Sequence, residues 1–427
     1  MRAPELVTQA APMPQPSRMD RIGSSLRVRN YRLYFIGQSI SVAGTWMQTL
    51  ALAFLVLDLT GSGADLGLTT AARFLPFLLL APIGGVIADR ANKRRLLYFT
   101  QTASAAVAIA FTVMCATGTA TVPLVIVLSL AAGGLMVFDN PARQALIPEM
   151  VPRRHLLNAV TLGSVSINIA RVFGAALGGT IVATVGLTWA FAINAVSFIA
   201  VLISLAMMRA AEMQPSERAP RAKGQIREGL SYARHTPALF LPLIMLTITG
   251  TLAFEFPITL PLVARGAFHG GAGTYGAMSA VMASGAIVGG LVAAGRQSPR
   301  RATALAVAAI GWGTAILATA LAPNLVLAFV ALVFVGYGSI TFNSYAKTTL
   351  QLASEPSMRG RVMALWALAW GGTTVVGGPL VGWVAEELGS RWSLVIGGVP
   401  TIILGLLMYP ALRRIDHSSS RSVSAAA

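Results

Sequence analysis

The sequence is poor in charged residues, in cysteine and in histidine. Asp, Glu, Lys and Arg make up only 11% of its 427 residues, whereas they make up about 25% of a typical soluble domain. This deficit excludes a soluble enzyme, a disordered chain and a fibrous repeat. The single cysteine, Cys115, excludes an intramolecular disulfide and a cysteine-based zinc cluster. The four histidines are scattered and no HExxH motif occurs, so we expect no metal site and no enzymatic activity.

Apolar residues dominate instead, at 55% of the chain, and the mean hydropathy is +0.69. A helix that crosses a bilayer needs about 20 mainly apolar residues, and the sequence contains twelve stretches of that kind. The expected spans are residues 33–57, 66–88, 96–117, 121–142, 159–183, 187–208, 238–262, 274–294, 302–322, 324–345, 362–385 and 392–411. These stretches predict an all-α membrane protein that lies in a lipid bilayer.

The basic residues indicate how the chain is oriented. The net charge of +17 would suggest a nucleic-acid partner in a soluble protein, but here the bases are spread over many short segments between spans. With the N-terminus in the cytoplasm, only Arg265 and Arg391 fall in loops on the opposite side. Because cytoplasmic loops of membrane proteins are rich in Lys and Arg, we expect both termini to be cytoplasmic and no nucleic acid to bind.

The chain also contains an internal repeat. Residues 138–143 align with 342–347 at an offset of 204, and Gly84 aligns with Gly289 at an offset of 205. Such matches at equivalent spans predict two pseudo-symmetric six-helix bundles with a cavity between them. The expected domains are a cytoplasmic N-terminal segment at 1–32, an N-terminal bundle at 33–210, a cytoplasmic linker with a short surface helix at 211–236, a C-terminal bundle at 237–412 and a disordered cytoplasmic tail at 413–427.

The segment between spans 2 and 3 has the most distinctive motif. Residues 85–97 read GVIADRANKRRLL, which resembles the G-x-L-A-D-R-x-G-R-K-x-x-L signature of the major facilitator superfamily. The resemblance implies the fold of that superfamily and a cytoplasmic latch between the halves, built on Asp89 with Arg90 and Arg94 as charge partners. Asn92 stands where the signature has glycine, and asparagine tolerates a left-handed turn. The alternative is a solvated run of loop charges.

Two further segments resemble a narrower branch of that superfamily. Residues 44–48 read GTWMQ and residues 138–144 read FDNPARQ, and both are similar to bacterial enterobactin exporters and transmembrane secretion effectors. The resemblance implies a secondary active transporter that exports small organic molecules, siderophore-like or drug-like, across the bacterial inner membrane by alternating access. The alternatives are a small-nutrient importer (a symporter) on the same fold and a non-transporting sensor or scaffold.

The source of energy also follows from a missing motif. No G-x-x-x-x-G-K-[ST] sequence occurs, so the chain has no ATP-binding P-loop of its own. We expect an ion gradient, with protons in antiport, to drive transport without any cofactor. We further expect a monomer with a small-molecule substrate.

Three ionisable side chains are expected inside the bilayer: Arg73, Arg171 and Glu255. An ionised group at mid-bilayer costs about 2.5–3.5 kcal/mol on insertion scales and is functional by default. Desolvation favours the neutral form of a carboxyl group, so Glu255 is a candidate for proton exchange. The alternative is a structural ion pair with Arg73 or Arg171. Many drug-exporting members of the superfamily have an acid in span 1 near Thr45, and its absence here leaves Glu255 as the coupling candidate.

Asp139 and Arg143 lie four residues apart on one helix face, where they can pair. Their counterparts in the second half are Asn343 and Lys347. Because this position is near the cytoplasmic end of span 4, a gate or structural role is favoured over substrate binding.

Polar residues recur at helical spacing in spans 1, 5 and 7. They predict helix faces that meet water, or alternatively polar packing between helices. The candidate cavity-lining residues are Gln38, Ser41, Thr45, Gln48, Asn168, Thr247 and Thr251. In span 5, residues 174–179 read GAALGG, which is similar to the end of the superfamily's antiporter motif. Gly174 and Gly178 permit close helix contact, as a sliding seal between the halves or as ordinary packing.

Overall fold

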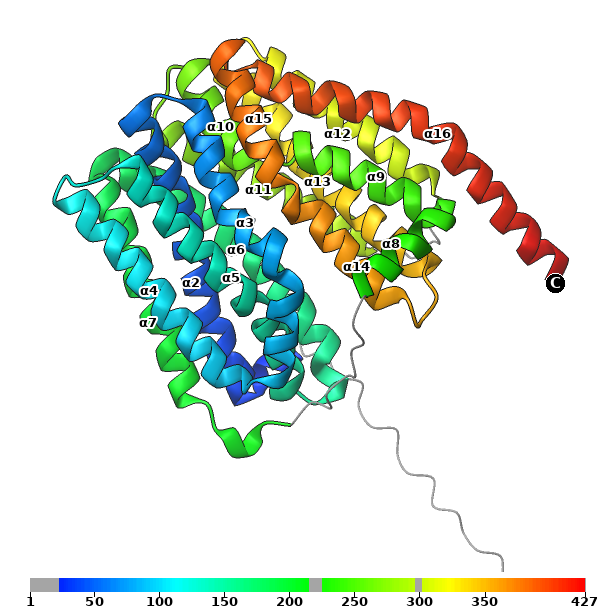
Figure 1. Cartoon of the computed structure of the whole chain (residues 1–427), viewed down its shortest axis with the longest axis horizontal. Coiled ribbons are helices and arrows are strands. Elements are labelled where there is room, and N and C mark those ends of the chain that lie inside the picture. Colours follow the sequence, from blue (N-terminus) through cyan, green and yellow to red (C-terminus); the bar gives the residue numbers. More distant parts are fainter. Residues whose placement is uncertain (1–22, 215–224, 296–301, 427) are drawn as a thin grey trace, which may run out of the picture.

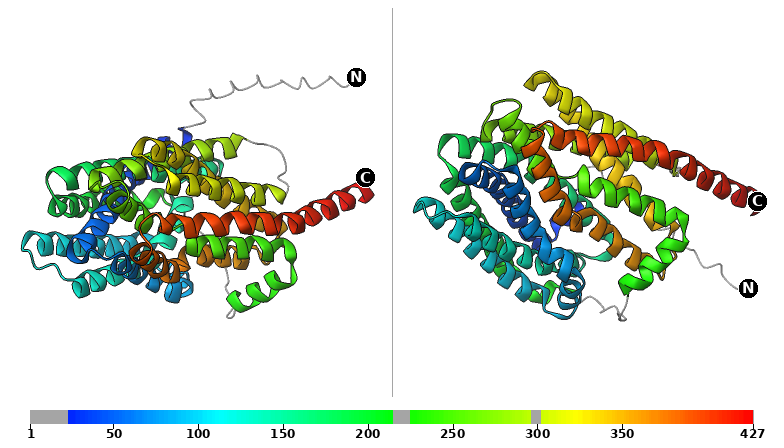
Figure 2. Two further views of the ribbon diagram at one scale, coloured as in Figure 1. Left: turned by 90° about the horizontal axis from the view of Figure 1, so that it is seen from above. Right: turned by 45° about the horizontal axis from the view of Figure 1, so that its top comes forward.

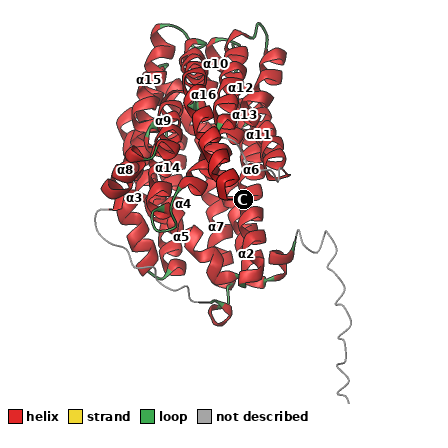
Figure 3. Cartoon of the chain, turned by 90° about the vertical axis from the view of Figure 1, so that its right-hand side faces the viewer, coloured by secondary structure: helices red, strands yellow, loops and turns green. Residues whose placement is uncertain are grey.

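The structure, a computed structural model, describes residues 23–214, 225–295 and 302–426. These residues form helices joined by short loops, and none of them forms a strand (Figure 1 and Figure 3). Twelve helical segments of the described chain are long and apolar enough to cross a bilayer. The expected all-α multi-pass fold with twelve spans is therefore confirmed.

Each half contributes six of these spans. The first half comprises η1 (Ser24–Arg27), α2 (Arg29–Thr60), α3 (Gly63–Arg90), α4 (Lys93–Ala116), α5 (Val122–Met150), α6 (Arg153–Thr184), α7 (Leu187–Met207) and η2 (Ala210–Glu212). The second half comprises α8 (Gln225–His235), α9 (Pro237–Leu252), α10 (Phe256–Gly266), α11 (Ala272–Gly295), α12 (Thr303–Leu321), α13 (Leu325–Ala353), α14 (Arg359–Ala367), the π-helical turn η3 (Leu368–Gly372), α15 (Thr374–Glu387) and α16 (Trp392–Ala426). Two spans are interrupted: α9 and α10 form one, and α14, η3 and α15 form another.

Local capping chemistry sets several helix ends. The hydroxyl of Ser62 accepts a hydrogen bond from the Asp65 amide at 3.1 Å, and the Asn92 side-chain oxygen accepts one from the Arg95 amide at 3.0 Å. Each bond satisfies an amide that has no partner within its own helix. Asn92 has a φ of −67°, so it caps α4 and does not form the left-handed turn that we considered for it.

The helix contacts repeat between the halves. In the first half α3 packs on α5 and α4 on α7, and in the second half α11 packs on α13 and α12 on α16. A Cβ atom on Gly84 would lie 2.3 Å from the Val137 carbonyl oxygen of α5, and one on Gly289 would lie 2.9 Å from the Tyr337 carbonyl oxygen of α13. The two glycines that match in sequence thus lie at equivalent helix crossings, as the internal repeat predicts.

The segments outside the spans are partly helical. Helix α8 lies where a short surface helix was expected in the linker, whereas residues 215–224 of that linker lie outside the described residues. The tail that we expected to be disordered at 413–427 continues α16 as far as Ala426, and this helix projects beyond the bundle in Figure 2. The Asp416 carboxylate accepts hydrogen bonds from the backbone amides of Ala302 and Thr303 at the start of α12. This contact anchors the extension, and a helix once formed gains one hydrogen bond per added residue.

Candidate functional site

The two halves meet mainly along two helix pairs, α3 with α15 and α6 with α11, and α2 adds contacts with α10 and α11. We call the end of the spans with η1, the α3–α4 turn and α8 the termini end, and the opposite end the far end. In Figure 1 the ribbons of the halves lie together at the far end, where α10 and α15 meet α3, and diverge toward α8 and α14. The candidate site is this interface, with its two ends and the middle of the spans between them.

At the far end, α3 and α15 touch through their backbones. A Cβ atom on Gly382 would lie 2.1 Å from the Gly63 carbonyl oxygen, and one on Gly67 would lie 2.2 Å from the Gly378 carbonyl oxygen. No side chain fits between these helices at either level. Glycine at these four positions therefore permits the close approach of the two halves.

The second helix pair, α6 with α11, uses the same kind of contact. A Cβ atom on Gly276 would lie 2.8 Å from the Cα atom of Gly179. The neighbouring glycines that we considered for a seal face elsewhere, because Gly174 lies against Ala43 and Gly178 against Met47, both in α2. Gly174 and Gly178 thus pack within the first half, and Gly179 faces the second half.

Polar groups also join the halves at the far end. Asp58 at the end of α2 pairs with Arg265 at the end of α10, with an N–O distance of 3.1 Å. One Glu386 carboxylate oxygen accepts hydrogen bonds from the Ser62 hydroxyl at 2.7 Å and from the Ala64 amide at 3.1 Å. An acid at this place is favourable because the start of α3 carries a positive dipole end and free amides.

At the termini end, Asp139 of α5 forms a network inside the first half. Its carboxylate pairs with Arg143 one helical turn later, as the i, i+4 spacing allowed. It also accepts hydrogen bonds from the Thr100 hydroxyl at 2.8 Å and from the Gln101 amide at 2.6 Å, both in α4. Asp139 is buried, and these donors offset the free-energy cost of removing its charged carboxylate from water.

The position in the second half that corresponds to Asp139 holds an amide, Asn343, instead of an acid. Asn343 of α13 accepts a hydrogen bond from the Trp366 indole of α14 at 3.2 Å, and the Lys347 ammonium lies 5.0 Å from the same ring. The Trp366 ring stacks on Trp370 at a centroid distance of 6.2 Å. Asn343 and Lys347 therefore meet around an aromatic side chain, whereas Asp139 and Arg143 meet as ions.

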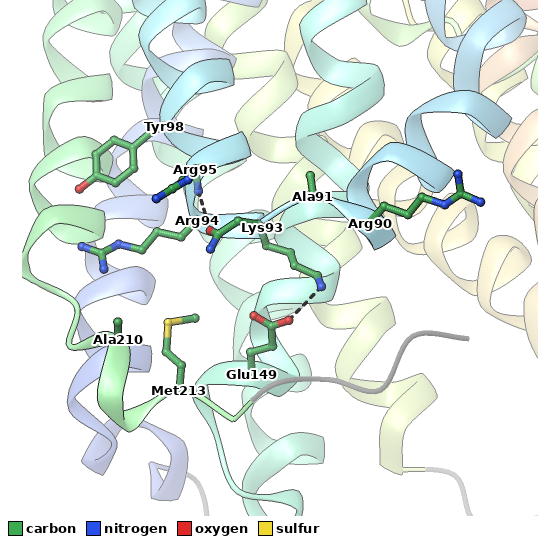
Figure 4. Close-up of a pocket in the computed structure, with 10 residues that line it drawn as sticks. Arg90, Ala91, Lys93, Arg94, Arg95, Tyr98, Glu149, Ala210 and Met213 are labelled. Carbon is green, nitrogen blue, oxygen red and sulfur yellow. Dashed lines mark hydrogen bonds and ion pairs between the residues drawn. The ribbon is translucent and has the colours of Figure 1, made fainter. Parts of the chain in front are cut away.

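The α3–α4 turn lines a basic cavity of about 720 Å³ at the termini end, drawn in Figure 4. Arg90 and Arg94 of the expected latch point in opposite directions there. Arg94 donates to the Ala206 carbonyl at 3.2 Å, and Lys93 pairs with Glu149 of α5 at 3.1 Å. The Asp89 side chain, the centre of the expected latch, lies outside the described residues.

Glu255 lies at the break between α9 and α10 and is 2% exposed. Its Oε1 atom is buried and has no hydrogen-bond partner. A Cβ atom on Gly377 would lie 3.0 Å from Oε1. The carboxyl group therefore faces α15, and the ion pairs formed by the described residues do not include it.

The two membrane arginines have neutral partners. Arg73 of α3 donates to the Thr49 hydroxyl of α2 at 3.2 Å. Arg171 of α6 donates to the Asn168 side-chain oxygen at 2.8 Å, and its guanidinium lies 5.5 Å from the centre of the Trp46 ring. Both cations thus lie beside α2, and the structural ion pair with Glu255 that we considered is not formed.

The expected cavity-lining residues fall into three groups, which differ in the partners of their polar atoms. Gln48 is 7% exposed and its side chain hydrogen-bonds with Asn194 of α7, so it lies inside the first half. Both polar atoms of the Gln38 side chain and the Ser41 hydroxyl are buried without partners. Thr45, Thr247, Thr251 and Asn168 each donate to the carbonyl four residues earlier in their own helix.

Sequence reasoning missed the partners that these groups use. Thr100, Gln101, Asn194 and Trp366 come from helices whose apolar pattern gave no reason to single them out. The exception is Asn194, which the sequence could have indicated, because an amide in an otherwise apolar span needs a buried partner. Glu386 had no signal, since it lies at a span end, where acids are common.

A family model described as "Transmembrane secretion effector" matches residues 23–425. The chain belongs to this family. It is a transporter of the major facilitator superfamily type, in agreement with the resemblance of residues 85–97 and 138–144. Among curated relatives, the staphyloferrin A transporter of Staphylococcus aureus (strain NCTC 8325 / PS 47) is 24% identical, over 90% of this chain and 96% of the relative.

Two other relatives are named as efflux proteins. The enterobactin exporter EntS of Escherichia coli (strain K12) is 23% identical over 91% of this chain and 92% of its own length. The multidrug efflux pump Tap of Mycolicibacterium fortuitum is 27% identical over 88% of this chain and 95% of its own length. These relatives are thus named for staphyloferrin A, for enterobactin and for multidrug efflux.

Solved structures share the fold at low sequence identity. An inward-facing, unoccupied bacterial homologue of the human lysosomal transporter Spinster has a TM-score of 0.71 at 15% identity, covering 94% of this chain and 99% of that chain. A single-residue mutant of the peptide transporter POT has a TM-score of 0.73 at 12% identity, covering 91% of this chain and 95% of that chain. These likenesses establish the transporter fold.

Proposed function

We propose that the chain is a secondary active transporter that exports small organic molecules, siderophore-like or drug-like, across the bacterial inner membrane. The observation that supports it most is the unequal interface. Backbone contacts and an ion pair join the halves at the far end, whereas Asp139–Arg143, Lys93–Glu149 and Arg361–Glu228 each join residues of one half at the termini end. Such an interface suits two bodies that rock about the middle of the membrane.

Alternating access gives each end of the interface a role. With both termini in the cytoplasm, the far end faces outward, so this structure corresponds to the inward-facing state. In the outward-facing state the termini end closes, and the latch of Asp89, Arg90 and Arg94 forms between the halves. The Asp139–Arg143 pair and its counterpart Asn343–Lys347 then lie beside this closure as the cytoplasmic gate.

Proton antiport is the proposed source of energy, with Glu255 as the coupling group. Its carboxyl group is buried at a helix break, has no ion-pair partner among the described residues and faces α15. Because α15 also meets α3 of the other half, rocking of the halves changes the surroundings of Glu255. A carboxyl group in this place can bind a proton on one side and release it on the other.

The test is proton flux in everted membrane vesicles, followed with a pH-sensitive dye while siderophores and lipophilic drugs are added. An exported cargo enters the vesicles and releases protons from their interior. We expect this release in wild type and its loss in Glu255→Gln. Glu387→Gln is the matched control, because Glu387 is an exposed acid at the end of α15, the helix that the Glu255 carboxyl group faces.

Each of the other possible results of this experiment contradicts one part of the proposal. Release that persists in Glu255→Gln assigns Glu255 to structure and removes it as the coupling group. Cargo and protons that move in the same direction identify the importer alternative. The absence of cargo movement with every compound, in vesicles that contain folded protein, contradicts transport and favours a sensor or scaffold.

A further inference from the structure

Arg73 and Arg171 place positive charge in the membrane, and no acid among the described residues pairs with it. Their hydrogen-bond partners are the Thr49 hydroxyl and the Asn168 amide oxygen, and none of the ion pairs formed by the described residues includes either arginine. The Nε atom of Arg171 is buried and has no hydrogen-bond partner. Charged groups at membrane depth normally face a cavity or a partner, so these two need an explanation.

Both guanidinium groups lie over one face of α2. Arg73 reaches that face from α3 at Thr49, and Arg171 reaches it from α6 at Trp46. Trp46 and Thr49 are three residues apart, and side chains at this spacing are neighbours, with Cβ atoms about 5–6 Å apart. The two cations are thus anchored within one helical turn of each other, one from α3 and one from α6.

This face of α2 is turned away from α7. Gly44 and Gln48 pack on α7 at Ser197 and Asn194, and Trp46 lies two residues from each, on roughly the opposite side of a helix with 3.6 residues per turn. Farther along α2, Phe54 contacts Tyr275 of α11 in the second half, with ring centroids 6.0 Å apart. The two cations therefore lie on the part of α2 that does not pack on α7, and the same helix reaches the second half at Phe54.

From this arrangement we infer that Arg73 and Arg171 form a binding site for an organic anion, and that the transported substrate has anionic oxygens such as those of a carboxylate. The inference rests on the proposed transport function and specifies its substrate class. Guanidinium groups bind such oxygens through charge-assisted hydrogen bonds. The Trp46 ring holds the Arg171 guanidinium in place, and the free Nε–H is a donor for the substrate.

The chemistry also excludes one class of cargo. Two fixed cations on the same surface repel a third, and this repulsion is strong because water screens poorly inside the protein. A lipophilic cation is therefore a poor substrate. A neutral molecule of the same shape gains no ionic contact and is expected to bind more weakly than the acid.

The test uses two probes that differ in charge and little in shape, salicylate and salicylamide, with purified full-length protein in lipid nanodiscs. Calorimetric titration should show salicylate binding at least about tenfold more tightly than salicylamide, which corresponds to one charge-assisted hydrogen bond. Arg73→Gln and Arg171→Gln should each weaken salicylate about tenfold and leave salicylamide unchanged. Arg171→Lys should retain most of the affinity because it keeps the charge.

Arg209→Gln is the matched control, since Arg209 is an exposed arginine of the same half that pairs with Glu212 outside the spans. Equal affinity for the acid and the amide overturns the inference, as does undetectable binding of salicylate by wild type. Unchanged salicylate affinity in both glutamine variants also overturns it. If a glutamine variant fails to fold, the acid–amide comparison in wild type and the Arg171→Lys variant decide.

Flux measurements separate this inference from the proposed function. Vesicles that transport tetraphenylphosphonium and reject salicylate show a working transporter with the wrong charge preference, which contradicts the inference alone. Arginine-dependent salicylate binding without movement of any cargo contradicts the transport proposal and leaves the anion site in place.

Discussion

The far end of the interface is held by contacts between the halves, whereas the polar groups at the termini end are satisfied within each half. At the far end, Gly63 and Gly67 of α3 meet α15 backbone to backbone. At the termini end, Asp139 has three partners and all belong to the first half. The polar groups at the termini end therefore keep their partners when the halves separate there, and none of their buried charges becomes unpaired.

The two kinds of contact also differ in the property of the residues on which they depend. A glycine contact depends on shape, and it can be made or lost as a whole when two rigid bodies rock. A buried ion network depends on every member, because removal of one leaves the others uncompensated. The comparison can be tested by changing one contact of each kind.

The largest effect is expected at the termini end, from Asp139→Ala. This change leaves Arg143, Thr100 and Gln101 without their shared acceptor, so the free energy of unfolding should fall by about 3 kcal/mol. Reversible unfolding in mixed micelles is the measurement. Asn343→Ala is the matched variant in the second half, and it should cost only about 1 kcal/mol because one neutral hydrogen bond is lost. Equal losses for both would show that the halves are stabilised alike.

A smaller effect is expected at the far end, from Gly67→Ala. The added methyl group would lie 2.2 Å from the Gly378 carbonyl oxygen, so α3 and α15 must move apart, at a cost of about 2 kcal/mol. Thiol labelling of a cysteine introduced at the far end should become faster. Gly134→Ala, at a helical glycine with no atom within 4 Å of the added group, should leave the labelling rate unchanged. Unaltered labelling in Gly67→Ala would mean that this contact does not hold the far end closed.

The smallest effect is expected from the ion pair of Asp58 with Arg265. Both side chains are about half exposed, and exposed pairs contribute less than about 1 kcal/mol, which salt screens. A double-mutant cycle with Asp58→Asn and Arg265→Gln should give a coupling free energy in that range at low salt and almost none at high salt. A coupling of several kcal/mol that persists in high salt would show that the pair, and not the glycines, is the main far-end contact.

The features that sequence predicted well are those set by composition and by local spacing. The twelve spans follow from apolar stretches of sufficient length, and the pairing of Asp139 with Arg143 follows from their i, i+4 spacing. The matched glycines Gly84 and Gly289 lie at equivalent helix crossings because a repeat in sequence is a repeat in packing. These features depend on a helix and its own residues.

The features that sequence did not predict depend on contacts between distant residues. Gln48 was assigned to a cavity because it shares a polar stripe, but its partner is Asn194, which is 146 residues away. The tail continues α16 as a helix, and its Asp416 accepts hydrogen bonds from the start of α12, a contact of which the composition of the tail gives no sign. A left-handed turn was considered for Asn92, which stands where the signature has glycine. Instead, Asn92 caps α4 with a side-chain hydrogen bond and has an ordinary backbone conformation.

The most direct test of a rocking motion of the two halves is whether the two ends of their interface move in opposite directions. Spin labels at Thr119 and Pro323 report on the far end, and labels at Arg154 and Glu355 report on the termini end, in a Cys115→Ser background. The distance within each pair is measured in nanodiscs with and without Gly67→Ala. We expect this substitution to lengthen the far-end distance and to shorten the termini-end distance. A longer far-end distance with an unchanged termini-end distance, or no change in either, would contradict a rocking motion.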